Sequence, residues 1–285
     1  MFERKKTVWL YLAPGLIGLL AFYLVPFVWG VWFSLTDGTI DNQFVGFANY
    51  LRVWQNEIFQ LGLKNTLELS LLCAPLIFVL SFLIASMLRK KTAGDAFFRN
   101  ALLMPYLMPS SALLIIWMLM FDYGGVVNRF VVALGGARVM WLEGGMLRVP
   151  IVLLYIWKNI GFSVVIFTAA LQAVPESLYE FASLEGAGFW RSEFQITLPQ
   201  ILPTAFLVLV LAMVNAFKIF KEVYFIGGAY PDTSVYTLQH YMNNKFAKLD
   251  YQDVTTAAYS FAVIVIVLFL LLYRQKSVRT GNTEA

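Results

Sequence analysis

The sequence is poor in charged residues and nearly free of cysteine and histidine. Aspartate, glutamate, lysine and arginine make up 13% of its 285 residues, whereas soluble domains carry roughly 25%. The single cysteine, Cys73, excludes a disulfide within the chain, and the single histidine, His240, is expected to be a solvated or structural residue of an outer loop. The sequence has no metal-ligating cluster, no G-x-x-x-x-G-K-S/T phosphate loop and no paired nucleophile and base. We therefore expect neither a metal site nor intrinsic catalysis.

The sequence contains long apolar runs, which accounts for its low content of charged residues. Hydrophobic residues make up 60% of it, and six apolar runs of 20 to 25 residues are continuous rather than periodic. A helix needs about 20 residues to cross the hydrocarbon, whereas barrel strands would be roughly 10 residues long and would alternate. The sequence predicts an all-α polytopic membrane protein, a single domain over 1–285, with six transmembrane helices. Their expected ranges are 9–33, 69–88, 101–121, 149–171, 201–220 and 254–273.

Three cations at 4–6 precede the first run, as they would precede a secretory signal peptide. A signal peptide has an apolar core of about 7–15 residues and ends at a small-x-small cleavage site. The run at 9–33 is longer and no such site closes it, so we expect a retained first span.

Lysine and arginine positions set the expected orientation, because these residues are enriched in cytoplasmic loops. With the N-terminus inside, the inner segments hold eleven of them in 61 positions and the outer segments hold eight in 95. The clusters at 4–6 and 89–91 lie beside span ends, where this bias acts most strongly. Both termini and the segment 172–200 are therefore predicted to be cytoplasmic. The net charge of +4 follows from the same asymmetry, and we expect no nucleic-acid partner.

The segment 172–200, called the coupling loop below, interrupts the apolar pattern with acids and glycines. Pro175 suits the first turn of a helix, and acids such as Glu180 suit its early turns. Gly186 supplies a stop, and a second short helix is expected over 189–197. One arginine against four acids is the reverse of a membrane-surface helix, which favours a docking surface for another protein. An ordinary amphipathic loop on the membrane surface is the alternative.

A further amphipathic segment is expected on the outer side. Over 43–65, aromatic and aliphatic side chains recur at three- and four-residue steps. This pattern predicts a helix that lies across the outer surface and covers span ends.

The letters YEFASLEGAGFWRSEFQITLP at 179–199 closely resemble the cytoplasmic loop motif of binding-protein-dependent ABC importer permeases. That motif has Glu-Ala-Ala, then a glycine, then Ile-x-Leu-Pro. Phe181 stands where alanine is usual, and Glu185 stands where aspartate commonly precedes the glycine. The matching residues are Glu180, Ala182, Gly186, Ile196, Leu198 and Pro199.

Four other segments look like the sugar-uptake branch of this family, the multiple-sugar or maltose type. They are FVGFANY at 44–50, MPYLMPS at 104–110, WKNIGF at 157–162 and FKIFKEVYFIGGAYP at 217–231. Within that branch the chain resembles the first permease subunit of the pair.

The resemblance implies a type I ABC importer permease fold in the bacterial plasma (inner) membrane, as a multi-pass protein in the lipid bilayer. It implies three kinds of partner: a second homologous permease, two ATP-binding cassette subunits that use ATP and Mg, and an extracellular or periplasmic solute-binding protein. This chain itself is expected to bind no cofactor. The function implied is ATP-driven import of a sugar or oligosaccharide. The alternatives are a permease for another polar solute such as a glycerol-phosphate-type compound, a secondary transporter, or a polytopic membrane enzyme.

Two sets of functional residues follow from the resemblance. The first docks the ATP-binding subunits: Glu180 would pair with a basic residue, apolar side chains would fill a cleft, and a glycine would allow close approach. This coupling set is Leu178, Glu180, Phe181, Ala182, Glu185 and Gly186. The second set lines the substrate pathway, with amide and aromatic groups suited to sugar hydroxyls and ring faces. This pathway set is Tyr155, Lys158, Asn159, Phe162, Ala212, Asn215, Ala216 and Ile219.

Lys158 is the most informative member of the pathway set. It lies about 13 Å into its span by helical rise, where a cation costs about 2.5–3.5 kcal/mol on insertion scales. It should therefore face the bundle interior or water. The alternative is that Lys158 and Asn215 only bond neighbouring helices. Lys218, Lys221 and Glu222 are expected near the outer interface, where they would snorkel or pair locally.

Overall fold

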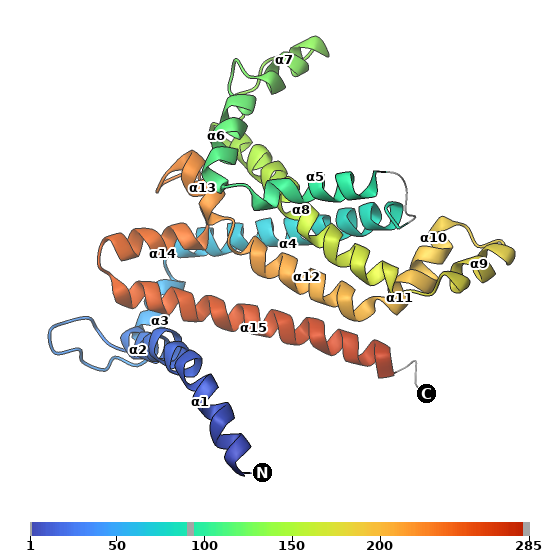
Figure 1. Cartoon of the computed structure of the whole chain (residues 1–285). Coiled ribbons are helices and arrows are strands. Elements are labelled where there is room, and N and C mark those ends of the chain that lie inside the picture. The colour runs from blue at the N-terminus through green and yellow to red at the C-terminus, as the bar shows by residue number, and fades with distance from the viewer. Residues whose placement is uncertain (1, 90–93, 282–285) are drawn as a thin grey trace. The chain divides into compact units, whose positions relative to one another are not determined.

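The computed structural model describes residues 2–89 and 94–281 and is built of helices, shown in Figure 1. Over these ranges no strand forms, and extended backbone pairs only in an isolated bridge between Thr36 and Phe44. Six helical segments are long and apolar enough to cross a membrane. They are Leu10–Ser34, Glu57–Met87, Ser110–Ala133, Gly144–Gln172, Leu202–Gly227 and Tyr251–Leu271. The prediction of an all-α chain with six membrane helices is confirmed.

The helical elements follow a simple order along the chain. They are α1 (Phe2–Leu19), the π-helix η1 (Leu20–Leu24), α2 (Val25–Ser34), α3 (Ala48–Trp54), α4 (Glu57–Met87), α5 (Asp95–Leu107), α6 (Ser110–Phe121), α7 (Val126–Ala133), the 3₁₀-helix η2 (Gly144–Leu147), α8 (Arg148–Gln172), α9 (Glu176–Leu184), α10 (Phe189–Ser192), the π-helix η3 (Glu193–Thr197), α11 (Leu198–Gln200), α12 (Leu202–Ala216), α13 (Phe220–Gly227), α14 (Leu238–Ala247) and α15 (Tyr251–Gly281). Two compact units can be described: a terminal unit of residues 1–63 with 241–285, and a central unit of residues 64–240.

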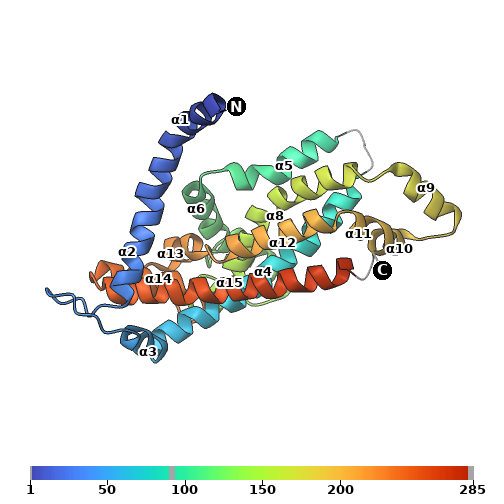
Figure 2. The same ribbon diagram turned by 90° about the horizontal axis from the view of Figure 1, so that it is seen from below.

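In the terminal unit, α2 and α3 are fixed on α15. The hydroxyl of Tyr259 donates to the carbonyl oxygen of Phe27, and the two rings meet edge to face with 5.2 Å between centroids. Arg52 of α3 forms an ion pair of 2.6 Å with Asp253. Helix α1 diverges from α15, as Figures 1 and 2 both show.

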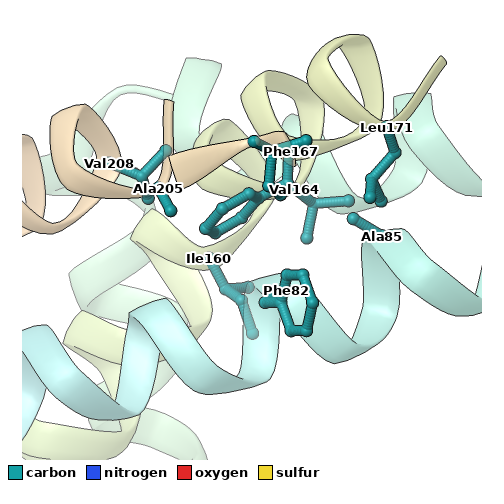
Figure 3. Packing of buried hydrophobic residues seen from close by; sticks show 9 residues of the cluster. Phe82, Ala85, Ile160, Val164, Phe167, Leu171, Ala205 and Val208 are labelled. Atoms are coloured by element: carbon teal, nitrogen blue, oxygen red, sulfur yellow. The ribbon is translucent and has the colours of Figure 1, made fainter. Parts of the chain in front are cut away.

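In the central unit, α4, α8 and α12 surround an apolar core, seen from close by in Figure 3. Phe167 of α8 is fully buried, and its ring centroid lies 5.4 Å from that of Phe78 and 5.6 Å from that of Phe82. Between membrane helices such close packing supplies much of the stabilisation, because lipid tails are as apolar as the side chains. The buried members of the core are Phe82, Ala85, Ile160, Val164, Phe167, Leu171, Ile201, Ala205 and Val208.

Helix α5 lies against α8 at a distance that only glycine permits. A Cβ atom on Gly161 of α8 would lie 1.9 Å from the carbonyl oxygen of Leu102 in α5. Next to this point the rings of Tyr106 and Phe162 stack, with 5.0 Å between centroids and 15° between planes. Small residues allow this kind of backbone approach between membrane helices.

Two apolar runs do not form the single helices expected of them. The run at 101–121 is divided between α5 and α6, because Met108 and Pro109 are extended, with ψ of 146° and 126°. A residue before proline disfavours the helical region, which accounts for the break. The run at 201–220 is interrupted by a turn at 217–219, which separates α12 from α13.

The outer amphipathic segment is also divided. The helix expected over 43–65 is instead α3 followed by the beginning of α4 at Glu57. The side-chain oxygen of Asn56 accepts hydrogen bonds of 2.9 and 3.1 Å from two backbone N–H groups in the first turn of α4. This N-cap starts a new helix, and so α4 begins well before the expected 69–88.

We expect Gly161→Ala to lower the thermal stability of the protein in detergent. The added Cβ has to displace the backbone of α5, and such overpacking typically costs about 1–3 kcal/mol. Gly145→Ala is the matched control, because no atom lies within 4 Å of a Cβ at that position. Equal melting temperatures for the two variants would show that the approach at Gly161 is not tight.

Candidate functional site

The coupling loop forms the two short helices expected from its sequence. Helix α9 follows Pro175 and ends where Gly186 adopts a left-handed conformation, with φ of +76°. The N–H of Gly186 donates to Ser183 over 3.1 Å, and the N–H of Ala187 donates to Ala182 over 2.9 Å. These two bonds form a Schellman motif, which satisfies the last carbonyl groups of the helix. The predicted glycine stop is confirmed, and α10 with η3 forms the second helix.

The free surface of α9 combines acidic and apolar side chains. Phe181 is 65% exposed and Leu184 is 86% exposed, while Glu180 and Glu185 are exposed beside them. Large apolar side chains that are exposed next to one another mark interaction sites. Leu184 was missed from the sequence, although it follows Glu180 by one helical turn.

Ala182 does not belong to this surface. It was expected to fill a cleft in a partner, but it is 8% exposed and lies on the inner face of α9. Tyr179, three residues earlier on the same face, hydrogen-bonds through its hydroxyl to the hydroxyl of Thr197 over 2.9 Å. The small size of Ala182 therefore serves packing within the loop.

Behind α9 the loop encloses a cleft of about 940 Å³. Its lining includes Arg89 just after α4, Tyr179 of α9 and Glu193 of η3. Glu193 is one of the four acids of the loop, yet it is only 1% exposed. Lys90 and Lys91, the other members of the cationic cluster expected at this span end, lie outside the described residues.

The structure places Lys158 in a buried polar cluster between three helices. Its ammonium group lies 2.7 Å from a carboxylate oxygen of Glu222 in α13 and 2.9 Å from the hydroxyl of Ser110 in α6. The side chains of Lys158 and Glu222 are 15% and 5% exposed. Lys158 thus joins helices, the alternative that the sequence left open, and its charge is neutralised within the chain.

Glu222 has a different partner from the one expected from the sequence. We expected it near the outer interface with a local partner, whereas it pairs with a residue 64 positions away. The available signal was Lys158 itself: a cation within a span needs an acid at the same depth.

The other pathway residues of α8 are Tyr155, Asn159 and Phe162. Two of them contact neighbouring groups of the central unit. The hydroxyl of Tyr155 is buried and has no hydrogen-bond partner among the described residues. The amide of Asn159 donates to the carbonyl of Tyr155 over 2.8 Å, and Phe162 stacks on Tyr106. Among these three residues, Tyr155 is therefore the one whose polar group makes no hydrogen bond within the described part of the chain.

The remaining members of the pathway set come from α12 and from the turn after it, and most of them are small or apolar. Ala212, Ala216 and Ile219 are buried, and Asn215 is partly exposed. Asn215 is the member of this group with a polar side chain open to a ligand.

His240 has a structural role. It lies in α14 rather than in a loop, and its side chain is fully buried. Its Nδ1 accepts a hydrogen bond of 3.2 Å from the backbone N–H of Thr237, and the ring of Phe220 packs edge-on with 4.7 Å between centroids. Burial lowers the pKa of His240 to about 4, so the imidazole is neutral at physiological pH.

This all-helical chain is similar to known membrane proteins. Residues 77–277 match the family described as binding-protein-dependent transport system inner membrane component. The chain belongs to this family. It is therefore a multi-pass transport permease, and the resemblance found in its loop is confirmed.

Curated relatives align with this permease over nearly its whole length. The sn-glycerol-3-phosphate permease UgpA of Yersinia pestis is 29% identical over 279 residues, which cover 96% of this chain and 95% of that one. The diacetylchitobiose permease NgcF of Streptomyces coelicolor is 29% identical and covers 95% and 82%. The lactose permease LacF of Rhizobium radiobacter is 27% identical and covers 93% and 92%.

Solved structures show the same fold. A bacterial ABC transporter that imports the acidic polysaccharide alginate matches with a TM-score of 0.82 and 25% identity, over 97% of this permease and 96% of that chain. The alginate transporter in complex with its periplasmic protein, bound to an alginate pentasaccharide, matches with a TM-score of 0.81 and 26% identity, over 94% and 93%. The expected ABC importer permease fold is confirmed.

We expect Lys158→Met to lower the free energy of unfolding of the permease by about 3–5 kcal/mol, because it leaves Glu222 buried and unpaired. The double variant Lys158→Met with Glu222→Leu should be close to the unaltered protein, since apolar residues replace both charges. Thermal unfolding in detergent measures both. The partly exposed pair of Arg148 with Glu68 is the control, and Glu68→Leu should change stability by less than about 1 kcal/mol. A single variant as stable as the double variant would contradict this assignment.

Proposed function

We propose that this permease is the membrane-spanning subunit of an ATP-driven importer for a sugar or oligosaccharide delivered by a solute-binding protein. The observation that carries the proposal is the exposed, glycine-terminated α9 in a chain of this family. Similarity to permeases named for diacetylchitobiose and lactose supports a sugar substrate.

The proposed assembly contains this chain as a single permease domain over 1–285, a second homologous permease and two ATP-binding cassette subunits. A periplasmic or extracellular solute-binding protein delivers the substrate, and the name of the matched family supports such a partner. The site of action is the bacterial inner membrane, with both termini and the coupling loop in the cytoplasm. ATP and Mg belong to the ATP-binding subunits, and this permease is not itself the hydrolase.

In this proposal, transport proceeds by alternating access, and α9 receives the motion of the ATP-binding subunits. Phe181 and Leu184 enter an apolar cleft of the partner, and Glu180 pairs with one of its cations. The left-handed Gly186 ends α9 abruptly and keeps the following backbone away from the docking face. Leu178 lies at the edge of this surface, and Glu185 extends its negative charge.

The charge balance in the membrane favours a neutral sugar over a glycerol-phosphate-type solute. An anionic substrate needs a cation that is free to bind it, and Lys158 is already paired with Glu222 at 2.7 Å. Apart from Lys158 and the internally bonded Asn159, the partly exposed polar side chain of the pathway set is the uncharged amide of Asn215. Uncharged donors and acceptors suit sugar hydroxyls.

We expect Glu180→Lys and Gly186→Pro each to lower sugar uptake and substrate-stimulated ATP hydrolysis at least about tenfold, as coupling free energies between sites commonly allow. The first reverses the docking charge, and the second cannot adopt a φ of +76°. Both should insert into the membrane normally. The assay is uptake of neutral mono- and disaccharides into vesicles that hold the complete importer, with and without ATP.

Two comparisons make this test decisive. Glu143→Lys, at an exposed acid outside the coupling loop, should leave copurification of the ATP-binding subunits unchanged, whereas deletion of 175–188 should abolish it. Uptake by the purified permease alone, with neither nucleotide nor partners, would instead establish a secondary transporter.

A further inference from the structure

A buried polar cluster lies where the coupling loop meets the end of α4. A carboxylate oxygen of Glu193 lies 3.2 Å from the guanidinium of Arg89, and its other oxygen accepts a hydrogen bond of 3.1 Å from Ser86. The guanidinium of Arg89 also lies over the ring of Tyr179, 3.8 Å from its centroid. The hydroxyl of Tyr179 in turn bonds to Thr197, at the end of η3. We call these five residues the loop joint.

The loop joint links three helical elements that are separate in the sequence. Ser86 and Arg89 come from α4 and the residues just after it, Tyr179 comes from α9, and Glu193 and Thr197 begin and end η3. Both a cation–π contact and a charge-assisted bond converge on Arg89, which fixes its planar group from two sides. Any displacement of α9 must therefore move Arg89 or break these contacts.

The helix made of α10 and η3 buries two polar side chains and exposes aromatic rings. Glu193 and Thr197 face inward, whereas the rings of Trp190 and Phe194 are exposed and stacked. Burial of a carboxylate is unfavourable unless it is paired and hydrogen-bonded. The buried carboxylate of Glu193 is paired and hydrogen-bonded in this way. Its position therefore points to a fixed connection rather than to burial of apolar area.

The same end of α4 is anchored in the apolar core. Phe82 and Ala85 of α4 pack in one cluster with Phe167 of α8 and Ala205 of α12 (Figure 3). Ser86 follows Ala85 directly, so the loop joint begins where the core ends. By contrast, the backbone that leads from α9 to α10 contains Gly186 and Gly188, and a Cβ at either position would meet no atom within 4 Å. The backbone that connects α9 to α10 therefore has free space around it, whereas the side chains of the loop joint bind α9 closely to the end of α4.

We propose that Arg89 and Glu193 are positioning residues that transmit the displacement of α9 to α4 and to the core. The inference rests on the proposed function, because it takes α9 as the element that the ATP-binding subunits move. It adds a specific path, through the loop joint rather than along the backbone that connects α9 to α10. A contiguous chain of packed and bonded side chains is a physical route for such coupling.

The experiment measures whether α9 and α4 move together in the complete importer. Spin labels are attached at Ser177→Cys on α9 and Met87→Cys on α4, two exposed positions outside the loop joint, after the buried Cys73 is replaced by alanine. With an intact joint, we expect the same distance between the labels before and after addition of ATP and Mg. With Glu193→Gln, which preserves shape but removes the charge, we expect the distance distribution to widen or shift on addition of ATP.

Function provides the second measurement. Glu193→Gln should leave copurification of the ATP-binding subunits and basal ATP hydrolysis unchanged, and should lower substrate-stimulated hydrolysis and uptake about tenfold. Adding Arg89→Gln to it should cause no further loss, because residues of one network are not additive. Glu68→Gln, which removes a carboxylate from the partly exposed pair with Arg148, is the matched control and should change neither distance nor uptake.

The outcomes separate this inference from the proposed function. A constant label distance in Glu193→Gln, or normal stimulated hydrolysis, overturns the role of the loop joint. Loss of copurification in Glu193→Gln also overturns it, because the joint would then only hold the docking surface in shape. If deletion of 175–188 leaves the ATP-binding subunits attached, the proposed docking role of α9 fails instead.

Discussion

The ion pair between Lys158 and Glu222 joins two helices of the central unit through buried charges. A charge among membrane helices requires a counter-charge at its own depth, because neither lipid nor apolar side chains can solvate it. This requirement brings α13 to α8 and, through Ser110, to the beginning of α6. The turn at 217–219 lets α13 take a different course from α12, so that an acid from the end of the fifth apolar segment lies beside the fourth.

The loop joint applies the same constraint at another place in the central unit. There the carboxylate of Glu193 satisfies Arg89 and Ser86, and the aromatic side chains of η3 and α10 are left on the outside. Both buried ion pairs therefore connect elements that lie far apart in the chain. Each of them leaves an unpaired buried charge if its helices are displaced, which disfavours other arrangements of these elements.

The sequence was sufficient for the overall fold and for the shape of the coupling loop, because both depend on local patterns. Apolar length predicted the membrane helices, and Gly186 predicted the end of α9. The buried ion pairs could not be predicted in this way, since their partners are 64 and 104 residues apart and one sequence contains no record of which depths coincide. The divided helices had local signals that were overlooked: Pro109 follows a residue that it excludes from the helix, and Asn56 is a favourable N-cap.

The approach of α5 to α8 at Gly161 has a consequence for how the permease can change shape. Atoms already in backbone contact have no intervening side chains that could exchange rotamers, so these two helices cannot slide past one another in small steps. They must travel as one rigid body. The chain leaves the helical conformation at the extended residues Met108 and Pro109, directly after α5. In the proposed transport cycle, a change of angle between this helix pair and α6 would fall on these two residues.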